Sequence, residues 1–221
     1  MDTLTLIQTY KKPIPKDIVE KTLSNLPKNV SYQFYNDNRR DEYMKTQTSE
    51  IYNLFKKLKH QAHKTDIFRY CILYEFGGIY VDADSIILQP INPSLFENDC
   101  IFIYDKRSHN IFTGFIYTKK HNPIIKKVID YMIKDNAQCT SLESKEFDTL
   151  GYKFHYNIDA LSVEFQKHYN IRFKNGNILN KYSNLNWNVY LYTDRDKRYI
   201  KDEQGKKIII LKNDRYPKKY K

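Results

Sequence analysis

The sequence predicts an α/β fold with a mainly parallel central sheet, and three observations support this prediction. Short runs of alternating apolar and polar residues, typical of strands, take turns along the chain with segments of helical periodicity. The 221 residues suffice for one hydrophobic core, and no repeat, low-complexity segment or linker divides them. Strands that alternate with helices favour a parallel sheet covered on both faces. We therefore expect a single domain over residues 1–221.

The first third of the chain opens with a strand, a helix and a second strand. Ile18, Thr22 and Leu26 recur at helical spacing, and Ile51, Leu54, Phe55 and Leu58 follow the pattern of a core-facing helix. Three consecutive residues with turn-forming side chains, 36–38, are expected to end the second strand. The expected elements are strands at 4–10 and 31–35 and helices at 17–26 and 49–59.

A helix over 65–76 comes next. Thr65 is expected to cap it and Gly77 to supply the left-handed residue that ends it. Pro123 suits the first turn of a later helix. The remaining expected elements are strands at 79–81, 85–88, 101–104, 112–118, 189–193 and 208–211 and helices at 123–133 and 160–169.

The composition is basic, with 37 Lys and Arg against 26 Asp and Glu, a net charge of +11. The positive electrostatic field of such a protein can concentrate phosphate-bearing partners, although scattered lysines more often form only a solvated surface. Together with 20 Tyr, the charge leaves open a protein that binds single-stranded nucleic acid by stacking and phosphate contacts. No recognition motif for nucleic acid accompanies it.

The three cysteines, Cys71, Cys100 and Cys139, are odd in number and have no C-x-x-C spacing. Neither a disulfide framework nor a zinc site is indicated, which favours a reducing compartment such as the cytoplasm. No signal peptide and no apolar stretch of about 20 residues is present, so a soluble protein is expected.

The chemistry concentrates in residues 64–90, KTDIFRYCILYEFGGIYVDADSIILQP. Asp66 and Arg69 lie three apart on one helix, so their side chains emerge from one face and can hold sugar hydroxyls. Asp82 and Asp84 follow a strand, and in a turn both can converge on one hard cation, Mn²⁺ or Mg²⁺. Either pair alone is more often an ion pair or a solvated turn, but their proximity in sequence favours a site.

This segment resembles the sugar-binding, DxD-containing region of retaining glycosyltransferases related to yeast initiating mannosyltransferases, capsular polysaccharide transferases and glucosylating toxins. The resemblance is strong over residues 64–91 and looser from 4 to 132. It implies a GT-A fold, a nucleotide-sugar donor and a divalent metal. By this resemblance Asp66, Arg69 and Tyr80 bind the donor, and Asp82 and Asp84 are catalytic residues on the metal and ribose side.

Other donor-binding candidates follow from the same resemblance. Gln8, Thr9 and Tyr10 stand near the position where the family carries a His and a Trp, and Tyr10 offers an aromatic face for a nucleobase. Packing in the core is an equal alternative for Tyr10. The segment TGFIYTKKHNP is similar to a later family segment, with Thr113 where the family has Asn and Asn110 as its substitute. Gly78 of the glycine pair completes the expected donor site.

The acceptor side is less defined, because a family Gly-Pro element is absent. His155 and Asp159 are candidate acceptor contacts, although a lone His among aromatic residues is more often packed in a core. The expected reaction moves a hexose from a UDP-sugar, with GDP-mannose as the alternative, to a glycan, protein or lipid hydroxyl. A phosphatase using Asp82 in a DxD loop is a weaker alternative, because no downstream acidic metal motif is visible.

Overall fold

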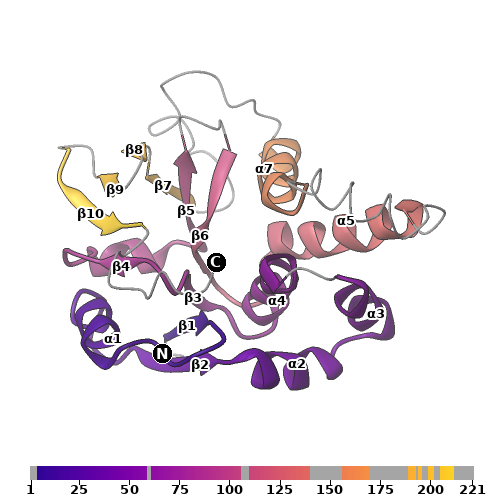
Figure 1. Cartoon of the computed structure of the whole chain (residues 1–221). Coiled ribbons are helices and arrows are strands. Elements are labelled where there is room, and N and C mark those ends of the chain that lie inside the picture. Colours follow the sequence, from indigo (N-terminus) through magenta and orange to yellow (C-terminus); the bar gives the residue numbers. More distant parts are fainter. Residues whose placement is uncertain are drawn as a thin grey trace.

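The computed structural model describes residues 4–58, 61–105, 110–139, 156–169, 189–192, 194–195, 199–201 and 205–211. Strands and helices alternate through most of this range, as the sequence predicts (Figure 1). In chain order the elements are β1 (Thr5–Thr9), α1 (Lys16–Leu23), β2 (Ser31–Tyr35), α2 (Asp37–Lys45), α3 (Ser49–Lys57), α4 (Gln61–Phe76), β3 (Gly78–Val81), β4 (Ile86–Ile87), the 3-10 helix η1 (Pro93–Glu97), β5 (Cys100–Asp105), β6 (Asn110–Thr118), α5 (Pro123–Cys139), α7 (Tyr156–Tyr169), β7 (Val189–Tyr192), β8 (Asp194–Arg195), β9 (Tyr199–Lys201) and β10 (Lys207–Ile210).

The central sheet has the strand order β2-β1-β3-β6-β5-β7. β1 pairs in parallel with both β2 and β3, and β5 pairs in parallel with β7. β6 runs antiparallel to its two neighbours, β3 and β5, so all the other strands of this sheet point the same way. The prediction of an α/β fold with a mainly parallel central sheet is confirmed.

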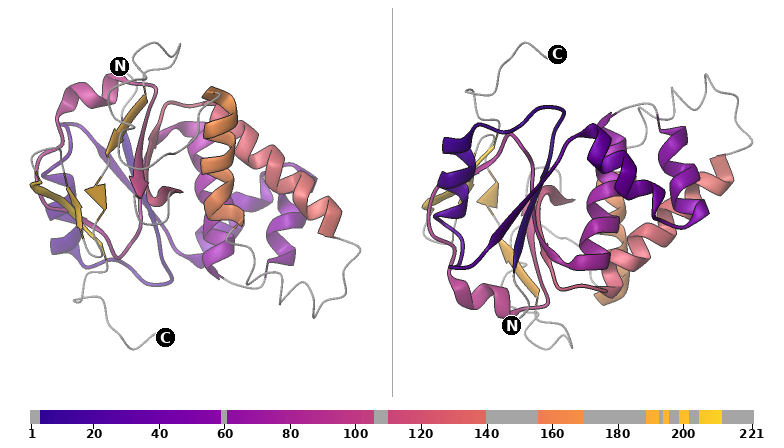
Figure 2. Two further views of the ribbon diagram at one scale, coloured as in Figure 1. Left: turned by 90° about the horizontal axis from the view of Figure 1, so that it is seen from above. Right: turned by 90° about the horizontal axis from the view of Figure 1, so that it is seen from below.

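A smaller antiparallel sheet, β4-β10-β9-β8, forms beside the central one. Its first pairing joins Ile87 to Ile209 and Ile86 to Ile210, so a strand just after the DxD segment is held by a strand near the end of the described chain. The two further views show this sheet on the same side of the central sheet as α1 (Figure 2). Sequence periodicity carries no signal for so distant a pairing.

Apolar side chains alternate between the two faces of the central sheet. Ile7 and Tyr80 belong to a core cluster with residues of α2, α3, α4, α5 and α7. Leu6, Ile79 and Val81 point the other way, into a cluster with residues of β9 and β10. Both faces of β1 and β3 are therefore buried, as expected for parallel strands in the middle of a sheet. No helix in the described part of the chain has the length and apolar character that a bilayer span needs.

The second strand ends before Asn36 as predicted, but residues 36–38 begin a helix instead of forming a turn. Asn36 caps α2: its side-chain oxygen accepts a hydrogen bond from the Arg39 backbone N–H at 2.8 Å. Asn is favoured both in turns and at helix N-caps, so the residue types alone do not separate the two. The helix predicted over 65–76 is longer than expected. It is observed as α4, which begins at Gln61, so Thr65 lies inside the helix rather than at its cap.

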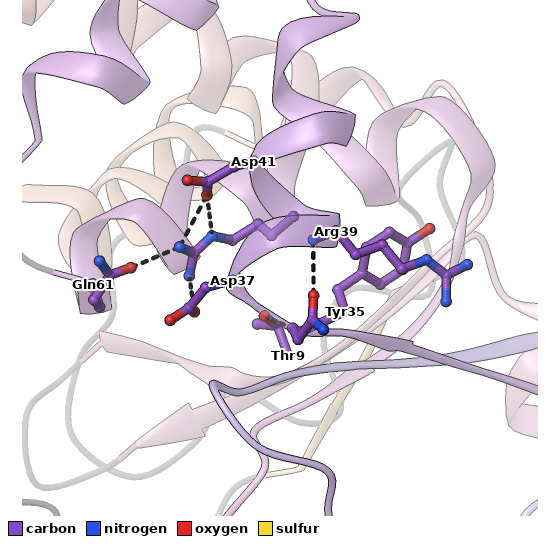
Figure 3. Close-up of polar contacts among 8 residues, drawn as sticks. Thr9, Tyr35, Asp37, Arg39, Asp41 and Gln61 are labelled. Atoms are coloured by element: carbon purple, nitrogen blue, oxygen red, sulfur yellow. Dashed lines mark hydrogen bonds and ion pairs between the residues drawn. The ribbon is translucent and has the colours of Figure 1, made fainter.

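A buried arginine fixes α2 to the start of α4. The Arg40 side chain is only 2% exposed, and its guanidinium lies 3.2 Å from Asp37 Oδ1 and 3.1 Å from Asp41 Oδ1. It also donates a 2.6 Å hydrogen bond to Oε1 of Gln61, the first residue of α4. Figure 3 shows Asp37, Asp41 and Gln61 gathered around this group. The contact fixes the N-terminal end of the helix that carries Asp66.

The glycine pair between α4 and β3 is required by close packing. Gly77 has φ +67°, and a Cβ there would lie 2.6 Å from the Lys120 backbone nitrogen. Gly78 has φ +110°, and a Cβ there would lie 2.7 Å from the Thr5 carbonyl oxygen. Any other residue would be strained and would collide with backbone. The predicted left-handed end of the helix at Gly77 is confirmed.

Candidate active site

The chain order of the strands places a topological switch point between β1 and β3. From β1 the chain moves to β2 on one side of the sheet, and it then crosses back so that β3 lies on the other side of β1. In sheets of this kind, ligands bind outside the carboxyl ends of the strands at such a switch point. Gln8 and Thr9 end β1, and Asp82 directly follows β3. The two predicted donor-binding segments therefore meet at this edge.

α4 carries the first pair of predicted site residues on its buried face. Asp66 and Arg69 are 7% and 5% exposed, and Asp66 Oδ1 lies 3.1 Å from Arg69 Nη2. The prediction that both side chains leave the helix on one face is confirmed by this contact. Because both are nearly fully buried, this is not the solvated surface ion pair that the spacing alone would favour.

The Arg69 guanidinium connects α4 with β3 and β6. Its Nη2 lies 3.5 Å from Asp82 Oδ1, and its Nη1 donates a 2.6 Å hydrogen bond to the Thr113 carbonyl oxygen. The guanidinium carbon sits 4.6 Å from the centre of the Tyr80 ring, and the Tyr80 hydroxyl donates to Asp82 Oδ1 at 3.1 Å. Asp66, Arg69, Tyr80 and Asp82 thus form one contiguous network, which we call the Arg69 network.

Burial sets the protonation states in this network. It raises the pKa of Asp66 to about 6, with the Arg69 charge opposing the rise and the Asp82 charge adding to it. Burial also raises the pKa of Tyr80 well above its ordinary value, so the phenol remains a hydrogen-bond donor at neutral pH. Burial alone would lower the pKa of Arg69, but its anionic neighbours raise it above the ordinary value. Arg69 is therefore the cation of the network, and Asp66 carries a pKa closer to neutrality than an ordinary carboxyl.

The DxD segment forms a tight turn at the end of β3. The Asp82 carbonyl oxygen accepts a 2.9 Å hydrogen bond from the Ser85 backbone N–H, which closes the four-residue turn. Ala83 packs in a small apolar cluster with α1, whereas the side chains of Asp82 and Asp84 flank it and are half-buried. The turn thus places two carboxylates at the carboxyl end of β3.

These two carboxylates suit a hard cation that completes its shell from a substrate. In the described part of the chain, no group of three or more His, Cys, Asp or Glu side chains could hold a metal ion by itself. Mg²⁺ and Mn²⁺ are commonly bound by one or two carboxylates plus phosphate oxygens and water. Asp82 Oδ1 is already engaged by both Tyr80 and Arg69.

The sequence analysis missed the role of Gly114 in this site. The Asp82 backbone N–H donates to the Gly114 carbonyl oxygen at 2.9 Å, and the Asp82 carboxylate lies directly over the glycine. A Cβ at Gly114 would come within 2.5 Å of Asp82 Oδ2. The signal was present, because an isolated glycine inside a strand often marks a close backbone approach.

The three β1 candidates differ in where their polar groups point. Gln8 is 1% exposed, and its Nε2 lies 3.5 Å from the Asp82 carbonyl oxygen. The Thr9 hydroxyl instead donates a 2.8 Å hydrogen bond to the Tyr35 carbonyl oxygen, on the β2 side (Figure 3). Tyr10 is partly buried against the apolar cluster at α1. Gln8 thus contacts the DxD turn through the Asp82 carbonyl oxygen.

Of the other predicted residues, only Thr113 is seen to contact the Arg69 network among those that the structure describes. Gly78 begins β3, at the opposite end of that strand from Asp82, where it meets Thr5. Asn110 begins β6 and pairs with Asp105 of β5. Thr113 joins the network through its carbonyl oxygen. Asp159 lies in α7, with a side chain outside the described set, and His155 lies outside the described residues.

Comparison with known proteins agrees with this site. Residues 15–101 match the family described as glycosyltransferase sugar-binding region containing DXD motif. The initiation-specific alpha-1,6-mannosyltransferase of Candida albicans is 28% identical over 111 residues, which are 46% of this chain and 29% of that protein. The chain thus spans under a third of the length of this curated relative.

Among solved structures, the PaToxG glycosyltransferase superposes with a TM-score of 0.50 at 15% identity, covering 74% of this chain and 69% of that chain. At this identity the likeness concerns the fold, and it confirms the predicted GT-A architecture. Over residues 15–101, which are less than half of the chain, the sequence is similar to the DXD-containing glycosyltransferases, in line with the resemblance seen in the sequence.

Proposed function

We propose that this protein is a metal-dependent, retaining hexosyltransferase that uses a nucleotide-sugar donor, with UDP-sugars preferred and GDP-mannose as the alternative. The observation that carries the proposal is the contact of Arg69 with both Asp66 and Asp82. This one side chain joins the helix expected to hold sugar hydroxyls to the turn expected to hold the diphosphate end. A nucleotide sugar needs both ends held within one crevice.

The polar groups of the site suit a neutral, hydroxyl-rich sugar. The two terminal nitrogens of Arg69 contact Asp66, Asp82 and the Thr113 carbonyl oxygen. Carboxylate oxygens accept hydrogen bonds from hydroxyls and repel a sugar that carries its own carboxylate. Tyr80 is buried beneath the guanidinium and holds it from one side.

The DxD turn also favours a cation. Asp82 and Asp84 lie two residues apart in one tight turn, and one or two carboxylates together with phosphate oxygens are a common ligand set for Mg²⁺. We propose that Asp84, together with Asp82, holds Mn²⁺ or Mg²⁺ alongside the diphosphate oxygens. When bound, the cation would stabilise the negative charge that develops on the departing nucleoside diphosphate.

We propose that the anomeric configuration is retained by front-face attack, in which the acceptor hydroxyl transfers its proton to the leaving phosphate as the new glycosidic bond forms. In the described part of the chain, the network carboxylates Asp66 and Asp82 are both held by Arg69, which favours direct attack by the acceptor over a covalent sugar adduct. A glycosyl adduct on a carboxylate, trapped and located by mass spectrometry, would instead establish double displacement.

The acceptor is a glycan, protein or lipid hydroxyl. Asp159 and His155 remain the candidate acceptor contacts, and Thr9, Tyr10, Gly78 and Asn110 remain candidate donor contacts. Two of the cysteines, Cys71 and Cys100, are free and buried, which agrees with a proposed reducing, cytoplasmic setting.

The decisive experiment screens a panel of UDP- and GDP-sugars with and without Mn²⁺, and measures thermal stabilisation and slow donor hydrolysis. We expect one donor to raise the unfolding temperature only with metal present, because ligand that binds only the folded state stabilises it. Asp84→Ala should abolish the metal-dependent part of the shift. The matched control is Asp130→Ala, which removes an exposed carboxylate on α5 that pairs with Lys126 outside the site. Stabilisation by single-stranded nucleic acid and by no sugar nucleotide would favour the nucleic-acid-binding alternative.

A further inference from the structure

Gln8 occupies an unusual position for an amide side chain. It lies near the end of β1, between two parallel neighbours, and is 1% exposed. Leu6, two residues earlier on the same face of the strand, packs in an apolar cluster. An apolar residue would be the usual occupant of such a site, because buried polar groups need hydrogen-bond partners.

The Gln8 amide is only half satisfied in this environment. Its Nε2 reaches the Asp82 carbonyl oxygen at 3.5 Å, a long hydrogen bond. Its Oε1 is buried and has no hydrogen-bond partner among the described residues. The amide therefore costs the fold stability relative to an apolar side chain of similar shape. Departures of this kind concentrate at functional sites.

The contact falls on the atom that closes the DxD turn. The Asp82 carbonyl oxygen accepts from the Ser85 backbone N–H as well as from Gln8, so the two donors converge on one acceptor. On the other side, the Asp82 N–H is held by the Gly114 carbonyl of β6. The peptide units on both sides of Asp82 are thus tied to neighbouring strands, and the orientation of Asp84 follows from the turn.

We propose that Gln8 is a positioning residue that fixes the DxD turn from β1, and that it acts on the metal and donor through Asp82 and Asp84 rather than by touching the nucleotide. The functional half of this inference rests on the proposed function, whereas its structural half concerns the turn alone. It replaces the earlier expectation that Gln8 contacts the nucleobase.

The test compares Gln8→Met, which keeps the side-chain length without the amide, with the wild type. Amide hydrogen exchange of Ser85, followed by NMR on the ligand-free protein, reports the turn. Titration with UDP in Mn²⁺ reports the site. Loss of one long hydrogen bond should speed Ser85 exchange and weaken UDP binding by about three- to tenfold each. The unfolding temperature should stay the same or rise, because the unpaired buried oxygen is removed.

The control is Thr22→Val, because the Thr22 hydroxyl is also buried without a hydrogen-bond partner among the described residues but lies on α1. It should leave Ser85 exchange and UDP affinity unchanged. Unchanged Ser85 exchange in Gln8→Met would overturn the proposal. If UDP affinity fell while exchange stayed the same, Gln8 would touch the nucleotide directly. If the wild type bound no UDP with Mn²⁺ and no other donor, the proposed function would fail, and Ser85 exchange would still decide the role of Gln8 in the turn.

Discussion

A methyl group added at Gly114 should disable the site while leaving the fold intact. The Cβ of Gly114→Ala would lie 2.5 Å from Asp82 Oδ2 and 2.2 Å from Cζ of Phe112. Favourable carbon contacts begin at about 3.5 Å, so the methyl would intrude by roughly 1 Å on both neighbours. Gly114 has no left-handed backbone angle, so the effect is one of space rather than of backbone strain.

The overlap can be relieved in two ways, and they differ in their effect on function. The Phe112 ring is only partly buried, so it can turn aside. The Asp82 carboxylate is held by Tyr80 and Arg69, and its displacement would weaken one of those contacts. Overpacking of this size lowers the free energy of unfolding by about 1–3 kcal/mol. For a chain of this length, a loss of about 2 kcal/mol lowers the unfolding temperature by roughly 4–8 °C. Loss of one hydrogen bond to a charged group costs about 1.5–3 kcal/mol, or roughly 10- to 100-fold in affinity.

Calorimetric titration with UDP in Mn²⁺, together with thermal unfolding, measures both quantities. Gly205→Ala is the matched control, because Gly205 has φ +78° and a Cβ there would meet nothing within 4 Å. It should cost about 1 kcal/mol of stability through its left-handed backbone and leave the affinity unchanged. Affinity within twofold of the wild type in a folded Gly114→Ala protein would refute the view that Asp82 is held against β6 for binding.

Three further predictions concern the charged groups. Arg69→Lys keeps the charge but cannot span Asp66 and Asp82 as a fork does, so we expect about 2 kcal/mol lower stability in urea unfolding and at least about tenfold weaker donor binding; equal affinity would contradict this. Burial raises the pKa of Asp66 in the folded protein from 3.8 to about 6, so the folded state binds this proton more tightly than the unfolded state does. The protonated Asp66 side chain therefore stabilises the fold fully below about pH 4, and this stabilisation is lost as the pH rises through 6. Between pH 4 and 7, the free energy of unfolding of the wild type should therefore fall by about 2–3 kcal/mol more than that of Asp66→Asn. An equal dependence of the unfolding free energy on pH in both proteins would contradict the raised pKa of Asp66. Arg40→Met should lower the free energy of unfolding by about 1–3 kcal/mol, since the two carboxylates left behind are partly exposed, and calorimetry would show no such loss if the α2 contact were dispensable.

The sequence predicted the parts of the fold that depend on local periodicity. The strand at 31–35 has the predicted bounds, and the helix expected at 49–59 is observed as Ser49–Lys57. α2 was missed because only Arg40 and Met44 are buried on it, so it shows no apolar stripe. One of these two buried residues, Arg40, is charged, and its partners come from α2 itself and from α4.

The candidate site shows the same division between local and distant information. The spacing of Asp66 and Arg69 predicted that they share a helix face, since the helical repeat alone decides this. It could not predict that Arg69 would also reach Asp82 and the Thr113 carbonyl, because those contacts depend on where β3 and β6 lie relative to α4. Likewise Gln8 was identified as a site residue, but its contact with a backbone carbonyl depends on the pairing of β1 with β3.

The connection between α4 and β3 explains how the two halves of the site keep their geometry. Arg69 and Asp82 lie on elements joined only by the glycine pair, yet they must stay within 3.5 Å of each other. Gly77 and Gly78 are packed against the backbone of Lys120 and Thr5, so this junction has no room to flex. Because the junction is anchored to β1 and to the segment after β6, the same strands that hold Asp82 also hold the base of the helix. A displacement of α4 would therefore have to disturb the central sheet, so we expect the proposed donor site at the Arg69 network to be formed before a donor binds.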